Sequence, residues 1–479
     1  MEALQRLHNR GSISTGYDID NSLKLEADNN EYLIKANDSG TNRKTFTVSM
    51  WFKRTELAND YMQLWQGGAN GEATRLGFYG GTPKEAIWVD IGGGSGNTGT
   101  LSRSYSNQVL RDTSAFYHIV LAVDTTQATE ANRWKLWLNG EEVTSWGARN
   151  YPAQDFQCAV EASINMHWGA YSATYYKTCG YIAECHYLDG VAKVQTDFGE
   201  YDEDSGIWIP KAYTGTYGGN GCYLNFDDSS ALGADSSGNG NTFTLNNITA
   251  ADQATDTPTN NFSTLNPLIE QGLIPARYTV SEGGTKQIST ADGYGCSVGT
   301  IGVSKGKWYF EAQFDSDGSG KHFGVIDEAS FTTGTAFVDG ISPGQQAYGV
   351  SIFKNGGINI DGSYVPSYSF SSFTTETLGC AMDLDNNKLY FSKSGTYGNS
   401  GDPTSGATGT GAIPLSTAGG GTWFISTGCY TGHALTNQGG YTSYTISSAA
   451  SDANGYGTFE YAPPSGYYAL CTKNLEEFG

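Results

Sequence analysis

The stretch from Ala115 to Val143, AFYHIVLAVDTTQATEANRWKLWLNGEEV, shows the clearest structural pattern in the chain. Large apolar residues occupy alternate positions on both sides of a polar loop: Ile119, Leu121, Val123, Trp134, Leu136 and Leu138. A period of two places such side chains on one face of a β-strand. Asn139-Gly140 then supplies residues that tolerate the positive φ of a tight reversal. The stretch therefore predicts a β-hairpin with one buried face, followed by a further turn.

Further strands are expected along the whole chain, because similar alternation recurs between turn-forming residues. In the N-terminal half the best examples are TFTVSMWF (45–52), AIWVDI (86–91), INMHWGA (164–170) and YIAECHYL (181–188). In the C-terminal half they are GKWYFEAQF (306–314), HFGVI (322–326), AYGVSIF (347–353), LGCAMDL (378–384), KLYFS (388–392) and TWFISTG (422–428). With 64 glycines, 31 tyrosines and 16% charged residues, the composition suits turn-rich β-structure. The sequence predicts an all-β protein.

The length of 479 residues exceeds what one ordinary core supports, so at least two domains are expected. Residues 1–20 are predicted to form a short arm. Residues 21–247 are predicted to form a first sandwich, in which CYLNF (222–226) is a late returning strand. Residues 248–275 include several Pro, Asn and Thr residues and are interpreted as an extended connector. Residues 276–479 then form a second β-sandwich.

The net charge of −22 opposes binding to nucleic acid, whose phosphates require a basic surface. The same charge disfavours an anionic membrane surface, and the sequence has no run of about 18 apolar residues that would insert into a membrane. The first residues, MEALQRLHNRGS, lack the apolar core of a secretory signal, so we expect synthesis in a cytoplasm. Most of the eight scattered cysteines are interpreted as small buried apolar side chains. Whether Cys179 and Cys185 pair stays open.

The hairpin also carries a pattern in which an aromatic residue, a His and an Asp precede an apolar-x-apolar-Asn-Gly stretch. The matching positions are Phe116, His118, Asp124, Leu136, Leu138, Asn139 and Gly140. In this pattern the first domain resembles the laminin-G/concanavalin-like jelly roll. Members of that fold usually recognise surfaces, and often sugars. The resemblance implies a concanavalin-like jelly-roll sandwich with a binding role.

The second domain resembles the SPRY domain, a bent β-sandwich that binds proteins or peptides. The matching pieces are Gly306–Glu311, Phe323–Val325, Tyr348–Val350, Leu378–Asp385 and Lys388–Gly395. The last piece fits the family's apolar-x-Phe-x-x-x-Gly pattern, except that Ser394 replaces the usual Asn. The resemblance implies a SPRY-like β-sandwich.

Two polar motifs, DSSGNGN (235–241) and DTPTNNFSTLNP (256–267), lie between the strands of these two domains. In combination with the two domains they resemble virion proteins of bacteriophages, marine phages in particular. The resemblance implies a phage virion structural protein, made in the host cytoplasm and located on the virion as a tail-fibre or adhesin component. Its expected partners are other virion proteins and a glycan or protein of the host surface. We expect a homo-oligomer; fibres are commonly trimeric, but no heptad repeat here would enforce that state.

The N-terminal arm is the expected docking segment for the virion. Its Leu4 and Leu7, together with Arg6 and Arg10, would make one amphipathic turn before Gly11 ends it. The alternative interpretation is a frayed terminus without a partner.

Aromatic residues in polar or Gly-rich surroundings are the candidate ligand-binding positions, because sugar rings stack their C–H faces on aromatic rings. These candidates are Trp65, Tyr79, Trp88, Tyr171, Tyr175, Tyr176, Tyr364 and Tyr368. The alternative for each of them is packing in a domain core or between subunits.

Clustered oxygen ligands raise the question of calcium, a hard cation that binds carboxylate and amide oxygens. The candidate ligands are Asp227, Asp228, Asp235, Asn239 and Asn241. Turns require the same Asx and Gly residues, so both interpretations stand. No other cofactor is expected.

A glycan-degrading enzyme is the main alternative function, since some concanavalin-like proteins are glucanases. Carboxylates alternate from Glu200 to Asp204, but Ser205-Gly206 follow at once and indicate a solvated turn. A retaining pair needs carboxyl groups about 5–5.5 Å apart, whereas residues two apart on a strand have Cα atoms about 6.6 Å apart. We therefore expect binding without catalytic residues. A purely structural virion protein is the third hypothesis.

Overall fold

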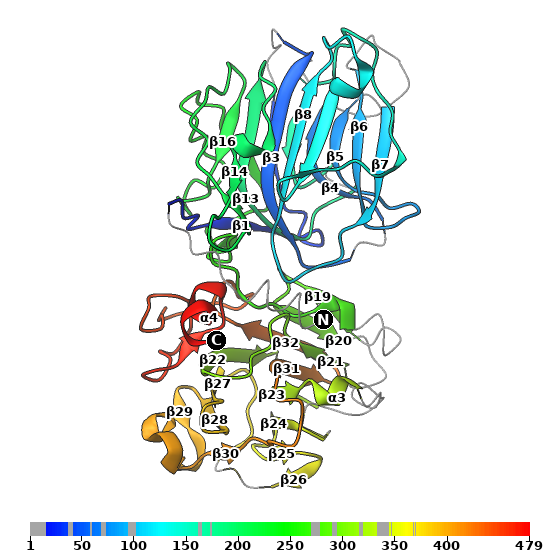
Figure 1. Ribbon diagram of the computed structural model, residues 1–479. Helices are drawn as coiled ribbons and strands as arrows, with labels where there is room; N and C mark the ends of the chain where they lie inside the picture. The colour runs from blue at the N-terminus through cyan, green and yellow to red at the C-terminus, as the bar shows by residue number, and fades with distance from the viewer. Residues whose placement is uncertain are drawn as a thin grey trace. The chain divides into compact units, whose positions relative to one another are not determined.

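The computed structural model describes residues 16–36, 42–57, 60–68, 73–93, 102–160, 165–172, 175–269, 278–289, 295–315, 320–332, 344–345, 347–366, 368 and 370–479. These residues belong to two compact units, one within Ser12–Thr259 and the other within Asn260–Gly479. Among the described residues, the regular secondary structure of both units is almost entirely β-strand, which confirms the all-β prediction (Figure 1). The proposed docking residues Leu4, Arg6, Leu7 and Arg10 lie outside the described residues.

The first unit is a sandwich of two large sheets with one short hairpin. Its strands are β1 (Ser22–Leu25), β2 (Tyr32–Lys35), β3 (Thr45–Arg54), β4 (Met62–Gly67), β5 (Thr74–Phe78), β6 (Ala86–Ile91), β7 (Ser102–Val109), β8 (Tyr117–Asp124), β9 (Trp134–Leu138), β10 (Glu141–Glu142), β11 (Trp146–Ala148), β12 (Met166–Trp168), β13 (Gly180–Asp189), β14 (Gly199–Tyr201), β15 (Trp208–Pro210), β16 (Cys222–Leu224), β17 (Thr244–Asn246) and β18 (Gln253–Ala254). Short 3₁₀ turns are η1 (Glu130–Asn132), η2 (Gln195–Asp197) and η3 (Ala250–Asp252).

The two large sheets of this unit pack face to face, as in a concanavalin-like jelly roll. One sheet has the order β10-β9-β8-β3-β13-β1-β18, with β16 also paired to β13. The other has the order β11-β7-β6-β5-β4-β12-β2-β17. Alternate residues of β3, Phe46, Val48, Met50 and Phe52, are fully buried in the core between them. Phe46 meets Trp65 of the opposite sheet with 6.1 Å between ring centroids, so both sheets contribute to one core.

The hairpin within residues 115–143 forms as predicted. Strand β8 pairs antiparallel with β9, with Ile119 opposite Leu138 and Val123 opposite Trp134. In Figure 1, β3 and β8 lie side by side, and every residue of β8 pairs with β3. Asn139 and Gly140 both have positive φ, 46° and 86°, and turn the chain from β9 into β10. A side chain at 140 would also lie 2.5 Å from Trp208, so glycine is required there.

The second unit is a SPRY-like sandwich of two further sheets. Its strands are β19 (Tyr278–Ser281), β20 (Lys286–Ser289), β21 (Gly295–Val298), β22 (Lys307–Phe314), β23 (His322–Asp327), β24 (Gly349–Phe353), β25 (Ile358–Ile360), β26 (Ser363–Val365), β27 (Leu378–Asp383), β28 (Lys388–Lys393), β29 (Thr396–Tyr397), β30 (Ile413–Pro414), β31 (Trp423–Cys429), β32 (Gly432–Asn437) and β33 (Tyr468–Ala469). Its helical turns are α3 (Ala329–Thr332), η4 (Gly398–Ser400), η5 (Pro403–Thr408) and α4 (Thr472–Phe478). The sheets have the orders β19-β20-β32-β22-β27-β28-β29 and β21-β31-β23-β24-β25-β26.

Strand β22 is buried on both faces, whereas its sequence predicts only one buried face. Trp308, Phe310 and Phe314 point into the core between the sheets, as their alternation predicts. On the other face, Glu311 accepts hydrogen bonds from the hydroxyls of Tyr309 and Tyr444, at 3.0 and 2.9 Å. The backbone N–H groups of residues 460 and 461 also donate to Glu311, both at 2.8 Å. The C-terminal segment therefore covers this face through a buried carboxylate.

The predicted connector, residues 248–275, is divided between the two units. Residues up to Thr259 belong to the first unit, and residues from Asn260 belong to the second. Strand β18 pairs with β1, whereas β16, within the predicted returning strand, pairs with β13. Two buried ammonium groups explain this docking, because Lys24 lies 2.8 Å from Asp252 and Lys53 lies 2.7 Å from Asp256. A buried charge requires such a partner.

All eight cysteines, including Cys179 and Cys185, are free and buried, which confirms their interpretation as small buried side chains. Within the described ranges, no helix has the length and apolar character needed to cross a membrane.

The Lys53–Asp256 pair gives a stability prediction. In Lys53→Met the Asp256 carboxylate loses its buried ammonium partner, so unfolding free energy should fall by about 3–5 kcal/mol. The matched control is Lys193→Met, which breaks a part-exposed pair with Asp197 at 3.3 Å and should cost less than about 1 kcal/mol. Urea unfolding followed by tryptophan fluorescence measures both variants. Equal losses for the two variants would contradict the proposed anchoring role.

A second prediction concerns His118 and acid stability. Its Nδ1 accepts a hydrogen bond from Trp208 Nε1–H at 3.0 Å, and burial, together with nearby His186, lowers its pKa from 6.5 to about 3. The unfolded chain therefore binds this proton between pH 6.5 and 3 while the folded chain does not, so stability falls as pH falls through that window. The part of the slope of unfolding free energy against pH that comes from His118 should approach about 1.4 kcal/mol per pH unit, the value of RT ln 10. It should vanish in His118→Gln, measured by urea midpoints from pH 7 to 4; an unchanged slope would refute the assignment.

Candidate functional site

One face of the sheet β7-β6-β5-β4-β12 points away from the jelly-roll core and carries polar and aromatic side chains. In β6, Ile87, Val89 and Ile91 enter the core, so Trp88 and Asp90 point to the opposite face. The same alternation puts the side chain of Arg75 on that outer face, because its neighbours Leu76 and Phe78 belong to the core.

A β-bulge in β4 decides which of its residues reach this outer face. The pairing of β4 with β5 shifts register between Gln63 and Trp65, which leaves one extra residue in β4. Leu64 and Trp65 both enter the core as a result, and Gln63 and Gln66 both point outward. Trp65 is fully buried and does not line an exposed surface, contrary to the prediction that it is a ligand-binding residue.

The register of the strands places polar residues in one row across the outer face. Successive members are directly opposite each other on neighbouring strands: His167, Gln66, Arg75, Asp90 and Arg103. Directly opposed residues of antiparallel strands have Cα atoms about 4.5–5.5 Å apart. The sheet therefore holds a continuous band of hydrogen-bonding side chains on five strands.

Asp90 is the centre of the charges in this row. Arg103 Nε lies 3.2 Å from Asp90 Oδ1, and Arg75 Nη1 lies 3.7 Å from Asp90 Oδ2. The indole of Trp88 also donates to Asp90 Oδ1, at 2.9 Å. Arg75 stacks over the ring of Tyr171, with 4.6 Å from its guanidinium carbon to the ring centroid. One carboxylate thus faces two guanidinium groups.

Several buried polar atoms of this outer face lack a hydrogen-bond partner among the described residues. They are Gln63 Oε1, Gln66 Oε1, Arg75 Nε and His167 Nδ1. Burial lowers the pKa of His167 from 6.5 to about 4, so its ring is neutral at neutral pH. Buried polar groups normally have partners, and those without one often mark a place where water or a ligand supplies it.

Aromatic rings form a connected cluster beside this polar row. The ring of Tyr61 lies 4.9 Å from that of Trp88, 5.4 Å from Tyr79 and 5.0 Å from Tyr176. Tyr79 stacks on Tyr105 at 4.6 Å, and Tyr176 contacts Tyr171 at 5.7 Å and Tyr175 at 6.1 Å. Arg103 lies over Tyr61 and Trp88, at 5.7 and 5.6 Å. We call this set of aromatic and polar side chains the aromatic face.

The exposure of the aromatic face is graded from rim to floor. Tyr175 is 60% exposed, and Trp88 is fully buried beneath the tyrosines. The other rings are half-buried: Tyr61, Tyr79, Tyr105, Tyr171 and Tyr176. Half-buried tyrosines over a polar floor offer both ring faces and hydrogen-bonding groups to a ligand.

The structure brings together most of the aromatic candidates that the sequence predicts in the first domain. Those in the cluster are Tyr79, Trp88, Tyr171, Tyr175 and Tyr176. The sequence analysis missed the residues that complete the face: Tyr61, Gln63, Gln66, Arg75, Asp90, Arg103, Tyr105 and His167. The signal for Asp90 and Arg75 was present in the alternation of AIWVDI and TRLGF, where polar residues occupy outward positions.

The two candidates in the second unit have different environments. Tyr364 lies on the edge strand β26, is 47% exposed, and accepts a hydrogen bond from the side-chain amide of Asn355 at 2.6 Å. Tyr368 is buried in the core, and its hydroxyl donates to the carbonyl of Gly411 at 3.2 Å. Its prediction as an exposed binding residue is therefore wrong, because the polar sequence around it does not reveal that the ring folds inward.

The predicted calcium ligands hold turns together. Asp235 accepts hydrogen bonds from the backbone N–H groups of Tyr223, Ser237 and Asn241, at 3.0, 2.9 and 2.7 Å. The side-chain amides of Asn239 and Asn241 both donate to the carbonyl of Gly221, at 2.9 Å. Asp228 closes a turn by accepting from Ser230, and Asp227 pairs with Asn225. Because N–H donors already occupy the Asp235 oxygens, this set fits the turn interpretation and does not fit calcium.

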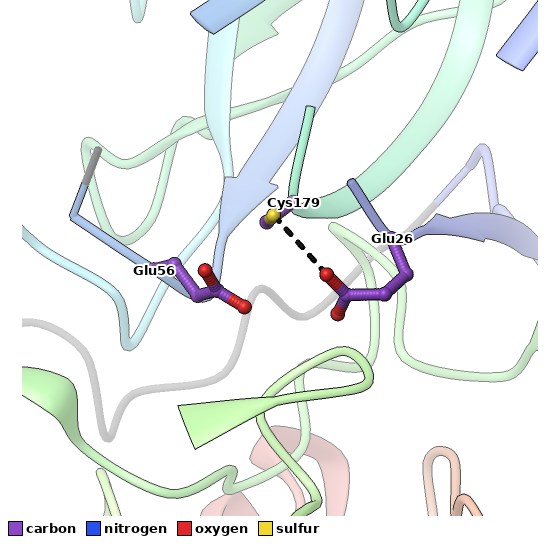
Figure 2. A group of neighbouring side chains, drawn as sticks. All are labelled: Glu26, Glu56 and Cys179. Atoms are coloured by element: carbon purple, nitrogen blue, oxygen red, sulfur yellow. Dashed lines mark hydrogen bonds between the residues drawn. The ribbon is translucent and has the colours of Figure 1, made fainter. Parts of the chain in front are cut away.

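A separate group of metal-ligand type lies near the ends of β1, β3 and β13. Figure 2 shows Glu26, Glu56 and Cys179 converging, with one ligand atom of each within 4.8 Å of the others. Cys179 Sγ donates to Glu26 Oε1 at 3.3 Å, and burial, with the two carboxylates, raises the pKa of the thiol well above 9. A metal would have to displace this proton. The arrangement therefore acts as a thiol–carboxylate hydrogen bond.

The acidic segment considered for catalysis forms a hairpin, as the turn prediction requires. Strands β14 and β15 pair across it, and Asp202 accepts from the N–H of Ser205 at 2.7 Å. Glu200 is paired with Lys211 at 3.2 Å. These carboxylates thus cap and flank a turn.

Similarity to known proteins is found only among solved structures. No protein family matches the sequence, and no curated protein matches it. Among solved structures, the chain is similar to the SPRY domain of human HERC1, with 12% identity, 34% of this chain and 92% of that chain covered, and a TM-score of 0.26. It is also similar to a Bacteroides ovatus protein titled a "putative carbohydrate binding protein", with 16% identity, 48% of this chain and 59% of that chain covered, and a TM-score of 0.31.

The thiol environment gives a prediction for this site. All eight cysteines are buried, and the Cys179 thiol is protonated, so a thiol reagent such as Ellman's reagent should find no rapidly reacting thiol in the native protein at pH 8. After unfolding in guanidinium, eight thiols should react, and seven in Cys179→Ser. A fast native reaction that disappears in Cys179→Ser would show a reactive thiolate and contradict the hydrogen-bonded assignment.

Proposed function

We propose that this chain is a binding component of a phage virion, of the tail-fibre or adhesin type, that attaches to a host-surface saccharide through the aromatic face of its jelly roll. The single observation that carries the binding proposal is the joint presence of clustered tyrosines and unpartnered hydrogen-bonding atoms on one sheet face. Sugars present apolar C–H faces and hydroxyl groups together, so one sugar can use both features of this face. Half-buried aromatic rings and convergent polar groups are the usual composition of such sites.

The virion assignment rests on the sequence resemblance carried by residues 235–241 and 256–267. In the structure, two of these residues stabilise the first unit: Asp235 closes a turn, and Asp256 pairs with Lys53. We propose that the protein is located on the virion, that its other partners are virion proteins, and that it forms a homo-oligomer, with a trimer the state usual for fibres. A host protein bound by the SPRY-like unit is the second candidate interaction, favoured by the exposed Tyr364 on the edge strand β26.

Binding without catalysis fits the chemistry of the aromatic face. A retaining glycosidase needs two carboxyl groups about 5–5.5 Å apart, one of them protonated. The polar row supplies Asp90 as its carboxylate, and two guanidinium groups and an indole N–H hold that carboxylate. Asp90 thus holds the two guanidinium groups and the indole in place, and the row pairs it with no second carboxyl group.

Substitutions in the aromatic face test the proposed function. Tyr61→Ala and Tyr175→Ala should each weaken binding to a host-surface polysaccharide about 10-fold, since losing one stacked ring costs about 1.4 kcal/mol. The matched control is Tyr201→Ala, which removes a tyrosine of 47% exposure from β14, outside this sheet. Binding is measured on an array of bacterial surface polysaccharides, with affinities by calorimetry.

Two results would contradict the proposed function. One is an array on which the wild-type protein binds no saccharide. The other is saccharide binding that Tyr61→Ala and Tyr175→Ala leave unchanged. Release of reducing ends during incubation would instead support the glycan-degrading alternative.

A further inference from the structure

The polar row of the aromatic face has an excess of positive charge. Arg75 and Arg103 flank Asp90, so the row carries two guanidinium groups and one carboxylate, and His167 adds no charge at neutral pH because burial keeps its pKa near 4. The chain as a whole has a net charge of −22. This local surplus of one positive charge, partly shielded from water, is opposite in sign to the charge of the whole chain and favours an anion there.

Arg75 is the group whose bonding is incomplete. It is 5% exposed, yet no hydrogen bond joins its guanidinium to another described residue, and its Nε–H is buried without a partner. Its contacts are the stack on Tyr171 and the 3.7 Å approach to Asp90, which exceeds hydrogen-bond length. A guanidinium presents five N–H donors, and leaving them unpaired in a desolvated place is costly.

An anionic group with two neighbouring oxygens is the best complement to such a guanidinium. Carboxylates and sulfate or phosphate oxygens accept two parallel N–H bonds from arginine, which adds both energy and orientation. Because the core fills the other side of the sheet, the exposed remainder of Arg75 lies on the aromatic face, where a ligand binds. Its neighbour in the row, Gln66, has a buried Oε1 without a partner, which suits a hydroxyl donor.

An unpartnered donor, on Arg75, and an unpartnered acceptor, on Gln66, are therefore neighbours on adjacent strands. An anionic acceptor would complete the hydrogen bonding of Arg75, and a hydroxyl donor that of Gln66. The Cα atoms of these two residues are about 5 Å apart. An acidic sugar carries an anionic substituent and ring hydroxyls within such a distance. A neutral sugar would satisfy Gln66 but would leave the charge of Arg75 without a counterion beyond Asp90.

We propose that the saccharide bound by the aromatic face carries an anionic group, a carboxylate or a sulfate ester, which forms paired hydrogen bonds with Arg75. This inference rests on the proposed saccharide-binding function and names the class of saccharide. Arg103 contributes by neutralising Asp90, so it acts as a positioning and charge-balancing residue. Gln66 Oε1 accepts a hydrogen bond from a hydroxyl of the same sugar.

The test compares acidic polysaccharides with their neutral counterparts on the full-length protein. The probes are polygalacturonate with its carboxyl-reduced form, and dextran sulfate with dextran, measured by calorimetry. At least one acidic polymer should bind 10-fold or more tightly than its counterpart, and which one does so distinguishes a carboxylate from a sulfate. Raising the salt concentration should weaken binding of the acidic polymer and leave the neutral one unchanged.

Variants then assign the effect to Arg75. Arg75→Gln should reduce acidic binding to the level of the neutral counterpart, and Arg103→Gln, whose side chain is 41% exposed, should reduce it about 3-fold. Arg133→Gln is the control, because Arg133 donates to backbone carbonyls outside this sheet. Thermal unfolding checks that each variant folds. If Arg75→Gln does not fold, the salt dependence of wild-type binding still tests whether the bound saccharide is anionic.

Different failures have different meanings. Equal binding of acidic and neutral forms, or full acidic binding by a folded Arg75→Gln, overturns this inference and leaves the saccharide-binding proposal standing. No binding to either member of both pairs also overturns the inference. If the polysaccharide array is blank as well, the proposed function falls with it.

Discussion

The antiparallel register of β12, β4, β5, β6 and β7 fixes the polar row of the aromatic face. Because alternate side chains of a strand point to opposite faces, a shift of one residue in any of these strands would exchange its core and surface residues. The bulge in β4 shows how sensitive this arrangement is. It turns Trp65 into the core and Gln66 outward, opposite Arg75, and so completes the polar row. The chemistry of the surface is thus set by backbone pairing.

The covered faces of both sandwiches depend on a second constraint, the pairing of buried charge. In the first unit, Glu184 accepts from the hydroxyls of Tyr17 and Tyr223, both at 2.6 Å. In the second unit, Glu311 accepts from Tyr309 and Tyr444. Each glutamate lies on a strand face turned away from the central core and binds the segment that covers it. These contacts use desolvated carboxylates, which tolerate burial only with several donors.

Much of the fold was predictable because its signals are local. The alternation in TFTVSMWF and GKWYFEAQF and the Asn139-Gly140 turn each specify geometry within a few residues. The docking of residues 248–259 could not be predicted from local signals. It depends on ion pairs of Lys24 with Asp252 and of Lys53 with Asp256, which are more than 200 residues apart in the sequence. The β4 bulge and the inward fold of Tyr368 are likewise tertiary effects. Aromatic candidates were found by their surroundings, but the arginines became visible only through cross-strand register.

The central claim is that the aromatic face is where this protein meets its saccharide, and footprinting of tyrosines measures that most directly. Hydroxyl-radical labelling, read by mass spectrometry with and without a bound acidic polysaccharide, reports the solvent access of each ring. The account predicts that labelling of Tyr61, Tyr79 and Tyr175 falls on binding, while labelling of the exposed Tyr201 and Tyr430 stays constant. Protection of Tyr201 or Tyr430, with Tyr61, Tyr79 and Tyr175 unchanged, would place the ligand elsewhere and contradict it.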